Sequence, residues 1–147
     1  DHDAIIDDYF RTAFGPDAAK CRQYLENLSE KFNPPYLRGE REQISEEAAQ
    51  NYADAIELVR AFKPLMDKNR YISEFCWAAS WGYLYRHAEL VELLAHALRE
   101  RALNNIHEAY QYWEKTAAHA WRMELDYHAM FDAWLFTGVF GRKFPKP

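Results

Sequence analysis

The sequence has 147 residues, of which 49% are hydrophobic and 28% charged, and it carries a net charge of −5. A chain of this length and composition forms one folded domain rather than a disordered segment, and its acidic balance without a basic stripe excludes an ordinary nucleic-acid-binding surface. No apolar run approaches the roughly 20 residues that a membrane-spanning helix needs, so we expect no membrane partner either.

The first two predicted elements are helices joined by a Gly-Pro pair. Apolar residues recur at helical spacing from about Asp3 to Phe14, with Asp3 as a suitable N-cap. We predict that Gly15 ends this helix with a positive φ and that Pro16 opens the next, because glycine adopts that φ freely and proline suits a first helical turn. The second helix stops before residues 33–43, which we predict to be a loop. Its apolar face consists of Ala18, Cys21, Tyr24, Leu25, Leu28 and Phe32.

Three longer helices are predicted downstream. Ser45 is placed as the N-cap of the first, and Pro64 is expected to kink or end it, because proline lacks the amide and clashes with the preceding turn. The second runs from about Tyr71 to Arg101, and the third from about Asn105 to Phe136. The seam of the first consists of Ala48, Tyr52, Ala55, Val59, Phe62 and Met66. The inner stripe of the third consists of Ile106, Tyr110, Trp113, Ala117, Trp121 and Leu125.

These elements predict an all-α fold, an antiparallel bundle of about five helices of which three are long. No segment shows the alternation of a strand or a fixed repeat period. Residues 1–147 are expected to form a single helical domain. The chain opens without methionine, so we expect that its start was removed by processing or by truncation. It is expected to be a C-terminal fragment of a larger protein.

The two cysteines, Cys21 and Cys76, both fall in apolar helical stretches. Two thiols are too few for a disulfide framework, and two buried free thiols are favoured over a bridge between them. The cellular compartment therefore stays open, and a secreted or periplasmic parent protein is compatible with the sequence.

Side chains that could carry chemistry occur singly along the predicted helices. Glu124, His128 and Asp132 share one face, but one helix cannot complete a metal coordination sphere, so we expect no metal there. The Glu92–His96 pair is likewise interpreted as a solvated face. The sequence contains no nucleophile elbow, glycine-rich phosphate loop or HExxH motif. We therefore expect no catalytic residue and no cofactor.

The tryptophans are the candidates for ligand binding. Trp77 and Trp81 lie one helical turn apart and so share a face, and flat aromatic faces stack on the apolar C–H groups of sugar rings. Aromatic residues at helical spacing more often pack in a core or at a domain interface. Packing is therefore the favoured interpretation of this pair, with carbohydrate binding as the alternative.

One stretch is more specific than these. It reads Asp8-Tyr9-Phe10-Arg11-Thr12-Ala13-Phe14-Gly15-Pro16-Asp17-Ala18-Ala19 and is followed by Arg22, Tyr24 and Leu25. It resembles the start of the helical domain that follows the catalytic barrel in bacterial glycoside-hydrolase-like proteins, a domain family of unknown function. The post-catalytic helical domains of hexosaminidase-type enzymes are looser relatives of the same pattern. The resemblance implies an all-α bundle that packs on an upstream barrel, which would itself hold the catalytic carboxylates.

Three functions follow from these observations. The first is a non-catalytic accessory domain of a glycan-degrading protein, whose partner is the upstream catalytic domain of the same chain. The second is an independent protein-interaction module, and the third is a bundle that binds carbohydrate or another small ligand. An exposed apolar patch would favour the first two, whereas a cavity lined by convergent polar groups would favour the third. The aromatic residues that could supply such a patch are Trp77, Trp81, Tyr85, Trp113 and Trp134.

Overall fold

The computed structural model describes residues 1–32, 34–37, 44–127 and 129–147, and these residues form α-helices and two short 3-10 turns without any strand. The predicted all-α fold is confirmed. The α-helices of the described residues are α1 (His2–Phe14), α2 (Ala18–Lys31), α3 (Pro34–Leu37), α4 (Glu46–Asn69), α5 (Phe75–Ala102), α6 (Ile106–Tyr127) and α7 (Ala133–Phe140). The 3-10 turns are η1 (Gly15–Asp17) and η2 (Gly141–Lys143).

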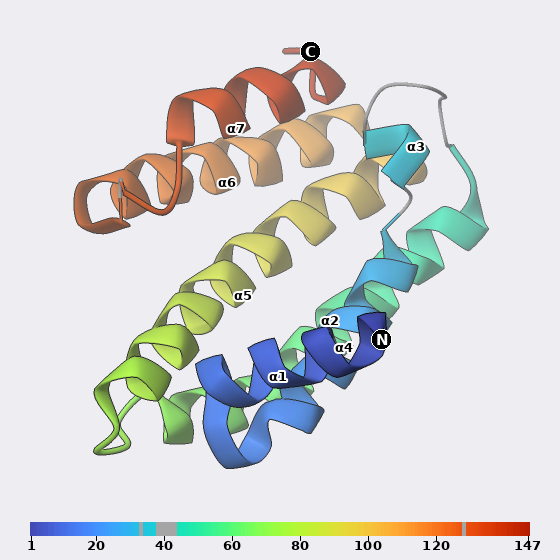
Figure 1. Ribbon diagram of the computed structural model, residues 1–147. Coiled ribbons are helices and arrows are strands. Elements are labelled where there is room, and N and C mark those ends of the chain that lie inside the picture. The colour runs from blue at the N-terminus through green and yellow to red at the C-terminus, as the bar shows by residue number, and fades with distance from the viewer. Residues whose placement is uncertain (33, 38–43, 128) are drawn as a thin grey trace.

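Helix α5 runs through the middle of the bundle (Figure 1). On one side it packs against α4, which precedes it as an antiparallel neighbour, and against α1. On the other side it packs against α6, and α7 folds back along α6. The helical hairpin of α1 and α2 lies against the α4 side. The molecule therefore has two lobes, α1–α2–α4 and α6–α7, and both rest on α5.

Three buried clusters of the described residues hold these lobes to α5, and the smallest joins α5 to α6 and α7 around Leu90 and Ala133. The first lies between α1, α2, α4 and α5 and is centred on Trp81, whose ring meets the edge of Phe14 at a centroid distance of 5.2 Å. Tyr24 of α2 stacks on Phe62 of α4 in the same cluster, at 4.3 Å. The second cluster lies between α4, α5 and α6, where Trp113 stacks on Phe144 near the end of the chain. Burial of aromatic surface on both sides makes α5 the shared wall of both clusters.

The junction between the first two helices is largely as predicted. Gly15 has a φ of +65° and follows the last residue of α1, which confirms the expected positive φ. Pro16 sits in the first turn of the next helical segment, although that turn is the 3-10 turn η1 and α2 begins only at Ala18. The prediction of Asp3 as the N-cap was wrong, because α1 already begins at His2. The carboxylate of Asp1 accepts the hydrogen bond from the backbone N–H of Asp3 and caps the helix instead.

Helix α4 confirms the expected cap and seam but not the expected end. The Ser45 hydroxyl accepts from the Ala48 N–H at 3.1 Å, and the seam residues face the core. The helix continues through Pro64 to Asn69. Pro64 and Arg60, one turn earlier, both lie on the solvent side of α4. Pro64 has no N–H for the Arg60 carbonyl, and water can solvate that carbonyl instead.

Other boundaries also differ from the expectation. Helix α5 begins at Phe75 rather than Tyr71, after a turn. Residues 34–37, which were expected to be loop, form the short helix α3, while Asn33 and residues 38–43 lie outside the described residues. Both thiols are free, but only Cys21 is buried; Cys76 is exposed.

The last predicted helix is in fact two helices. Helix α6 ends at Tyr127, and α7 starts at Ala133 and turns back. The reversal buries Ala133 against Leu90, Ala120 and Met123 instead of extending the helix into solvent. The prediction of the inner stripe of α6 was also partly wrong, since Trp121 and Leu125 are exposed. The buried residues of α6 are Ala109, Trp113, Thr116, Ala120 and Met123.

This choice of face has a simple packing reason. Apart from Trp113 and Met123, the buried residues of α6 are small, and small residues let its backbone approach α5 closely. A face built on Trp121 would hold the two helices further apart.

Candidate functional site

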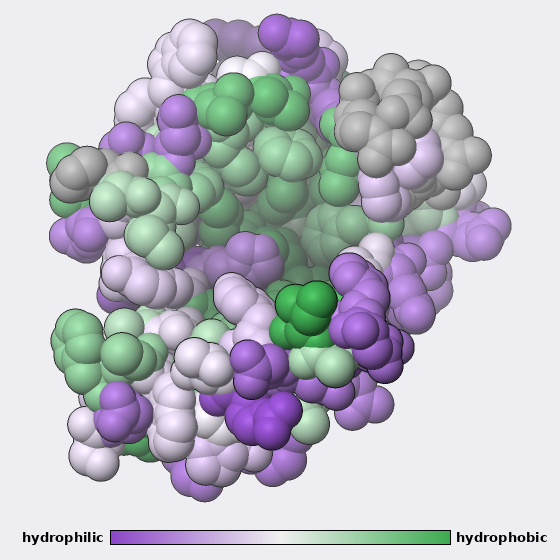
Figure 2. Space-filling model, in the orientation of Figure 1, coloured by the Kyte–Doolittle hydropathy of each residue, from purple (hydrophilic) through white to green (hydrophobic). Residues whose placement is uncertain are grey.

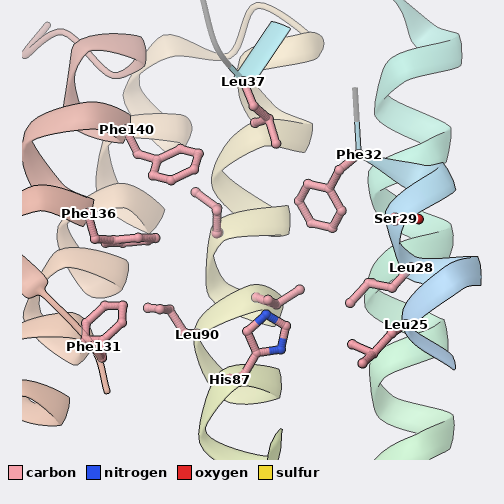
Figure 3. A pocket seen from close by; sticks show the side chains of 12 residues that line it. Leu25, Leu28, Ser29, Phe32, Leu37, His87, Leu90, Phe131, Phe136 and Phe140 are labelled. Carbon is pink, nitrogen blue, oxygen red and sulfur yellow. The ribbon is translucent and has the colours of Figure 1, made fainter. Parts of the chain in front are cut away.

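An apolar groove lies between the two lobes. Figure 2 shows it as a hollow lined by hydrophobic residues in the middle of this face of the molecule. Helix α2 forms one wall of the groove, α7 and Phe131 form the other, and α5 forms the floor (Figure 3). Its volume is about 440 Å³. The lining residues are Leu25, Leu28, Ser29, Phe32, Leu37, His87, Leu90, Val91, Leu94, Phe131, Phe136 and Phe140.

Helical periodicity explains why these residues meet. Leu25 and Leu28 lie three residues apart on one face of α2, and Phe32 follows four residues later at the C-cap of that helix. Phe136 and Phe140 lie one turn apart on α7, with a ring-centroid distance of 4.9 Å. Each wall is therefore a continuous apolar stripe. The groove exists because α2 and α7 face each other across α5 without filling the space between them.

Two of the described lining side chains, Ser29 and His87, are polar. Ser29 donates its hydroxyl hydrogen bond to the backbone carbonyl of Glu26 at 2.7 Å, so this donor is already satisfied within α2. His87 lies on the floor, where solvent reaches its imidazole through the groove opening while apolar side chains surround it. His87 is thus exposed at the groove opening, but the apolar side chains beside it displace part of the hydration of the charged imidazolium and lower the pKa of His87 below its usual value.

Another, smaller hollow of about 300 Å³ is polar. It lies between α5 and α6 and is lined by Arg86, Glu89, His119, Arg122, Met123, Asp126 and Tyr127. Arg86 binds the Glu89 carboxylate at 2.9 Å, and hydrogen bonds to Tyr127 and Glu89 raise its pKa.

The imidazole of His119 is the unusual group in this polar hollow. Its Nε2 atom is buried without a hydrogen-bond partner among the described residues, and it lies 3.9 Å from a carboxylate oxygen of Glu89. Desolvation lowers the pKa of His119 even though the Glu89 charge acts in the opposite direction. An unpaired buried nitrogen of this kind has a free hydrogen-bonding position for a water or a polar ligand.

Trp77 and Trp81, the predicted ligand-binding pair, do lie together, and they fasten the end of α1. The indole N–H of Trp77 donates to the carbonyl of Thr12, and that of Trp81 donates to the carbonyl of Phe14, both at 3.0 Å. Trp81 is completely buried, so neither of its faces is open to a sugar ring. Trp77 is half-buried, and its ring lies directly against Gly15; sugar stacking by Trp77 stays a prediction.

The acidic residues of the Glu124, His128 and Asp132 stripe have another role. A Glu124 carboxylate oxygen accepts from the Ala133 N–H at 2.6 Å, and Asp132 accepts from the Leu135 N–H at 2.7 Å. Both carboxylates therefore cap the start of α7. His128 lies outside the described residues. The described part of the chain contains no group of three or more His, Cys, Asp or Glu side chains arranged to hold a metal ion.

Large apolar side chains are also exposed on the outside of the molecule. Of the expected aromatic surplus, Trp134 is 74% exposed, whereas Trp113 and Trp81 are buried and Trp77 and Tyr85 are half-buried. The exposed large hydrophobic residues are Ile5, Tyr9, Ile44, Tyr71, Phe75, Tyr83, Leu103, Trp121, Leu125, Met130, Trp134, Leu135 and Val139. Within the described residues, no helix is both long and apolar enough to cross a membrane.

Sequence reasoning missed the groove. The spacing of Phe136 and Phe140, shortly after the capping Asp132, was a usable signal for a separate apolar helix. Comparison with protein-family models, with curated proteins and with solved structures finds no significant match. The candidate functions therefore depend on the geometry of this chain.

Proposed function

We propose that this chain is a non-catalytic accessory domain that packs on a catalytic domain of the same protein through the outer face of α7 and the adjoining end of α6. The observation that carries the proposal is the exposure of α7. Its eight residues, Ala133–Phe140, include no charged side chain, yet only Ala133 is buried. A helix that is apolar on all sides is normally buried on all sides.

The energetic argument follows from the exposed area. Trp134, Leu135 and Val139 lie on α7, and Trp121 and Leu125 lie one turn apart on α6. Burial of one such side chain contributes about 1.5–3 kcal/mol, so leaving all of them in water forgoes an amount comparable with the whole stability of a small domain, about 5–15 kcal/mol. A covering partner recovers that free energy.

The resemblance of residues 8–19 supports the identity of the partner. This stretch resembles the start of the helical domains that follow a catalytic barrel in bacterial glycoside-hydrolase-like proteins, and here it forms the α1–η1–α2 hairpin. Glycoside hydrolysis normally needs two carboxylates held about 5–10 Å apart across the scissile bond. In this chain several acidic groups serve as helix caps or ion pairs, such as Asp132 at the start of α7 and Glu92 with Arg60 at 2.8 Å. We therefore assign the chemistry to the partner domain.

The proposal is tested with the coding sequence upstream of this chain and with two variants. A barrel should be encoded immediately upstream, and the isolated chain should be inactive on chromogenic glycosides. The separately produced barrel should bind the chain, and Trp134→Ser should weaken that binding by about tenfold or more. Tyr71→Ser is the matched control, because Tyr71 is equally exposed at 74% but lies before α5. An upstream region without a barrel, glycoside turnover by the chain alone, or equal effects of the two variants would each overturn the proposal.

The polar hollow between α5 and α6 favours a second candidate, the binding of carbohydrate. Arg86, Glu89 and His119 converge there, and the buried imidazole nitrogen has no partner among the described residues. Hydroxyl-rich ligands suit such a mixture of donors and acceptors. Calorimetric titration of oligosaccharides into the chain tests it. Saturable binding that His119→Phe abolishes would support this candidate, and the absence of binding at millimolar concentrations would exclude it.

A further inference from the structure

We propose that the apolar groove between α2, α5 and α7 is a binding site for an uncharged, largely apolar small molecule, about 10 Å long, that carries one hydrogen-bonding group. This site is distinct from the outer face of α7 and does not depend on the accessory-domain function. It concerns the inner face of α7, whose rings point toward α2 (Figure 3).

The size of the groove sets the size of the ligand. Small-molecule pockets have volumes of roughly 300–1,000 Å³, and this groove, at about 440 Å³, is of that kind. Along the floor it extends from His87 to Leu94, two turns of α5, which is about 10 Å at 1.5 Å per residue. Leu37 of α3 stands at one end of the groove (Figure 3).

These dimensions favour a small molecule over a docked helix. A helical segment confined to two turns is too short to be stable in isolation, so its binding would have to offset the ordering of its backbone. A small molecule with few rotatable bonds has no such cost. The aromatic rings of Phe131, Phe136 and Phe140 on one wall and the side chains of Leu25 and Leu28 on the other offer dispersion contacts to an alkyl chain or a ring.

The chemistry of the lining sets the charge of the ligand. Among the described residues, no Lys, Arg, Asp or Glu side chain lines the groove, so an ion bound against these residues would lose its hydration without gaining a counter-charge from them. The apolar side chains around His87 lower the pKa of its imidazole, which favours the neutral form.

A neutral imidazole has one N–H donor and one acceptor nitrogen. No hydrogen bond or ion pair engages His87 within the described residues, whereas the Ser29 hydroxyl is already paired with a backbone carbonyl. His87 is therefore the group positioned to pair with the hydroxyl, carbonyl or amide of a ligand.

Displacement of a neutral fluorescent naphthylamine from the folded chain tests the site. 1-Octanol is the neutral probe, and octanoate and octyltrimethylammonium are charged analogues of the same chain length. At pH 8 we expect 1-octanol to displace the fluorophore. Each charged analogue should bind at least about tenfold more weakly than 1-octanol. Ser29→Trp, which places a large ring at the wall, should weaken 1-octanol binding by about tenfold or more, and Ser29→Ala is its matched control and should bind as the wild type does.

The imidazole has separate readouts. His87→Leu should weaken 1-octanol binding by about fivefold, the value of one net hydrogen bond, and leave the affinity for the fluorophore unchanged or higher. In the wild type, 1-octanol should shift the imidazole NMR signals of His87 but not those of His107 on α6, which does not line the groove. This measurement decides the question if Ser29→Trp does not fold. Three results would overturn the proposal: no displacement up to the solubility of 1-octanol, equal affinity for the charged analogues, or His87 signals that stay unchanged while the probe binds.

Discussion

Replacing Gly15 by alanine should destabilise the protein strongly, because two separate terms oppose a side chain there. The backbone has a φ of +65° and a ψ of −138°, a region that only glycine adopts without strain, at a cost of about 1–3 kcal/mol for another residue. The added Cβ would lie 2.6 Å from two ring carbons of Trp77. Displacing that ring adds about 1–3 kcal/mol of overpacking, so we expect a total loss of about 2–6 kcal/mol.

The assay is urea unfolding followed by far-UV circular dichroism and tryptophan fluorescence. Gly82→Ala is the matched control, because Gly82 lies inside α5 and a Cβ there would meet nothing within 4 Å. That substitution should stabilise the protein by about 0.8–1 kcal/mol, the difference in helix propensity. The same chemical change should therefore have opposite signs at the two positions.

A double-mutant cycle separates strain from overpacking. Trp77→Leu removes the ring that faces Gly15, so in that background Gly15→Ala should keep the backbone term and lose most of the steric term. Trp77→Leu also removes the N–H that donates to Thr12. If Gly15→Ala leaves the free energy of unfolding within about 0.5 kcal/mol of the wild type, or if its cost is the same with and without Trp77, the account of this junction is wrong.

Three further results are expected. Trp81→Phe should lower the free energy of unfolding by about 2–4 kcal/mol in urea, because it leaves a cavity and an unpaired carbonyl at Phe14; a loss below about 0.5 kcal/mol would contradict the role of this bond. The free energy of unfolding should fall as the pH drops below the ordinary histidine pKa of 6.5, because the unfolded chain binds a proton that His87, with its lowered pKa, does not bind in the folded chain. In denaturation at pH 5 and pH 7.5, His87→Leu should reduce this dependence of stability on pH. Asp132→Ala should lower the free energy of unfolding by about 1 kcal/mol, since it removes the carboxylate that accepts from the Leu135 N–H. Added Zn²⁺ should leave the melting temperature of the wild type unchanged. A rise in melting temperature that Asp132→Ala abolishes would point to a metal site instead.

Features that depend on a few neighbouring residues could be predicted from the sequence. The Ser45 cap, the positive φ of Gly15 and the seam of α4 were all correct, because each follows from local hydrogen bonding or from the 3.6-residue period. The all-α class followed for the same reason. Trp77 and Trp81 could be placed on one face, but their hydrogen bonds to α1 could not, since those partners lie 65 and 67 positions earlier in the chain.

Other features depended on partners that the local sequence does not reveal. Pro64 passes through α4 because that side of the helix is open to water, and α6 presents its small residues to α5 rather than Trp121. The chain reverses before Ala133 because two carboxylates cap α7 and Leu90 offers it a packing surface. The groove is the clearest case, since its walls come from α2, α5 and α7 and its empty space belongs to none of them. Periodicity determined which face of each helix is apolar, whereas the distances between the helices decided which of those faces were filled and which stayed open.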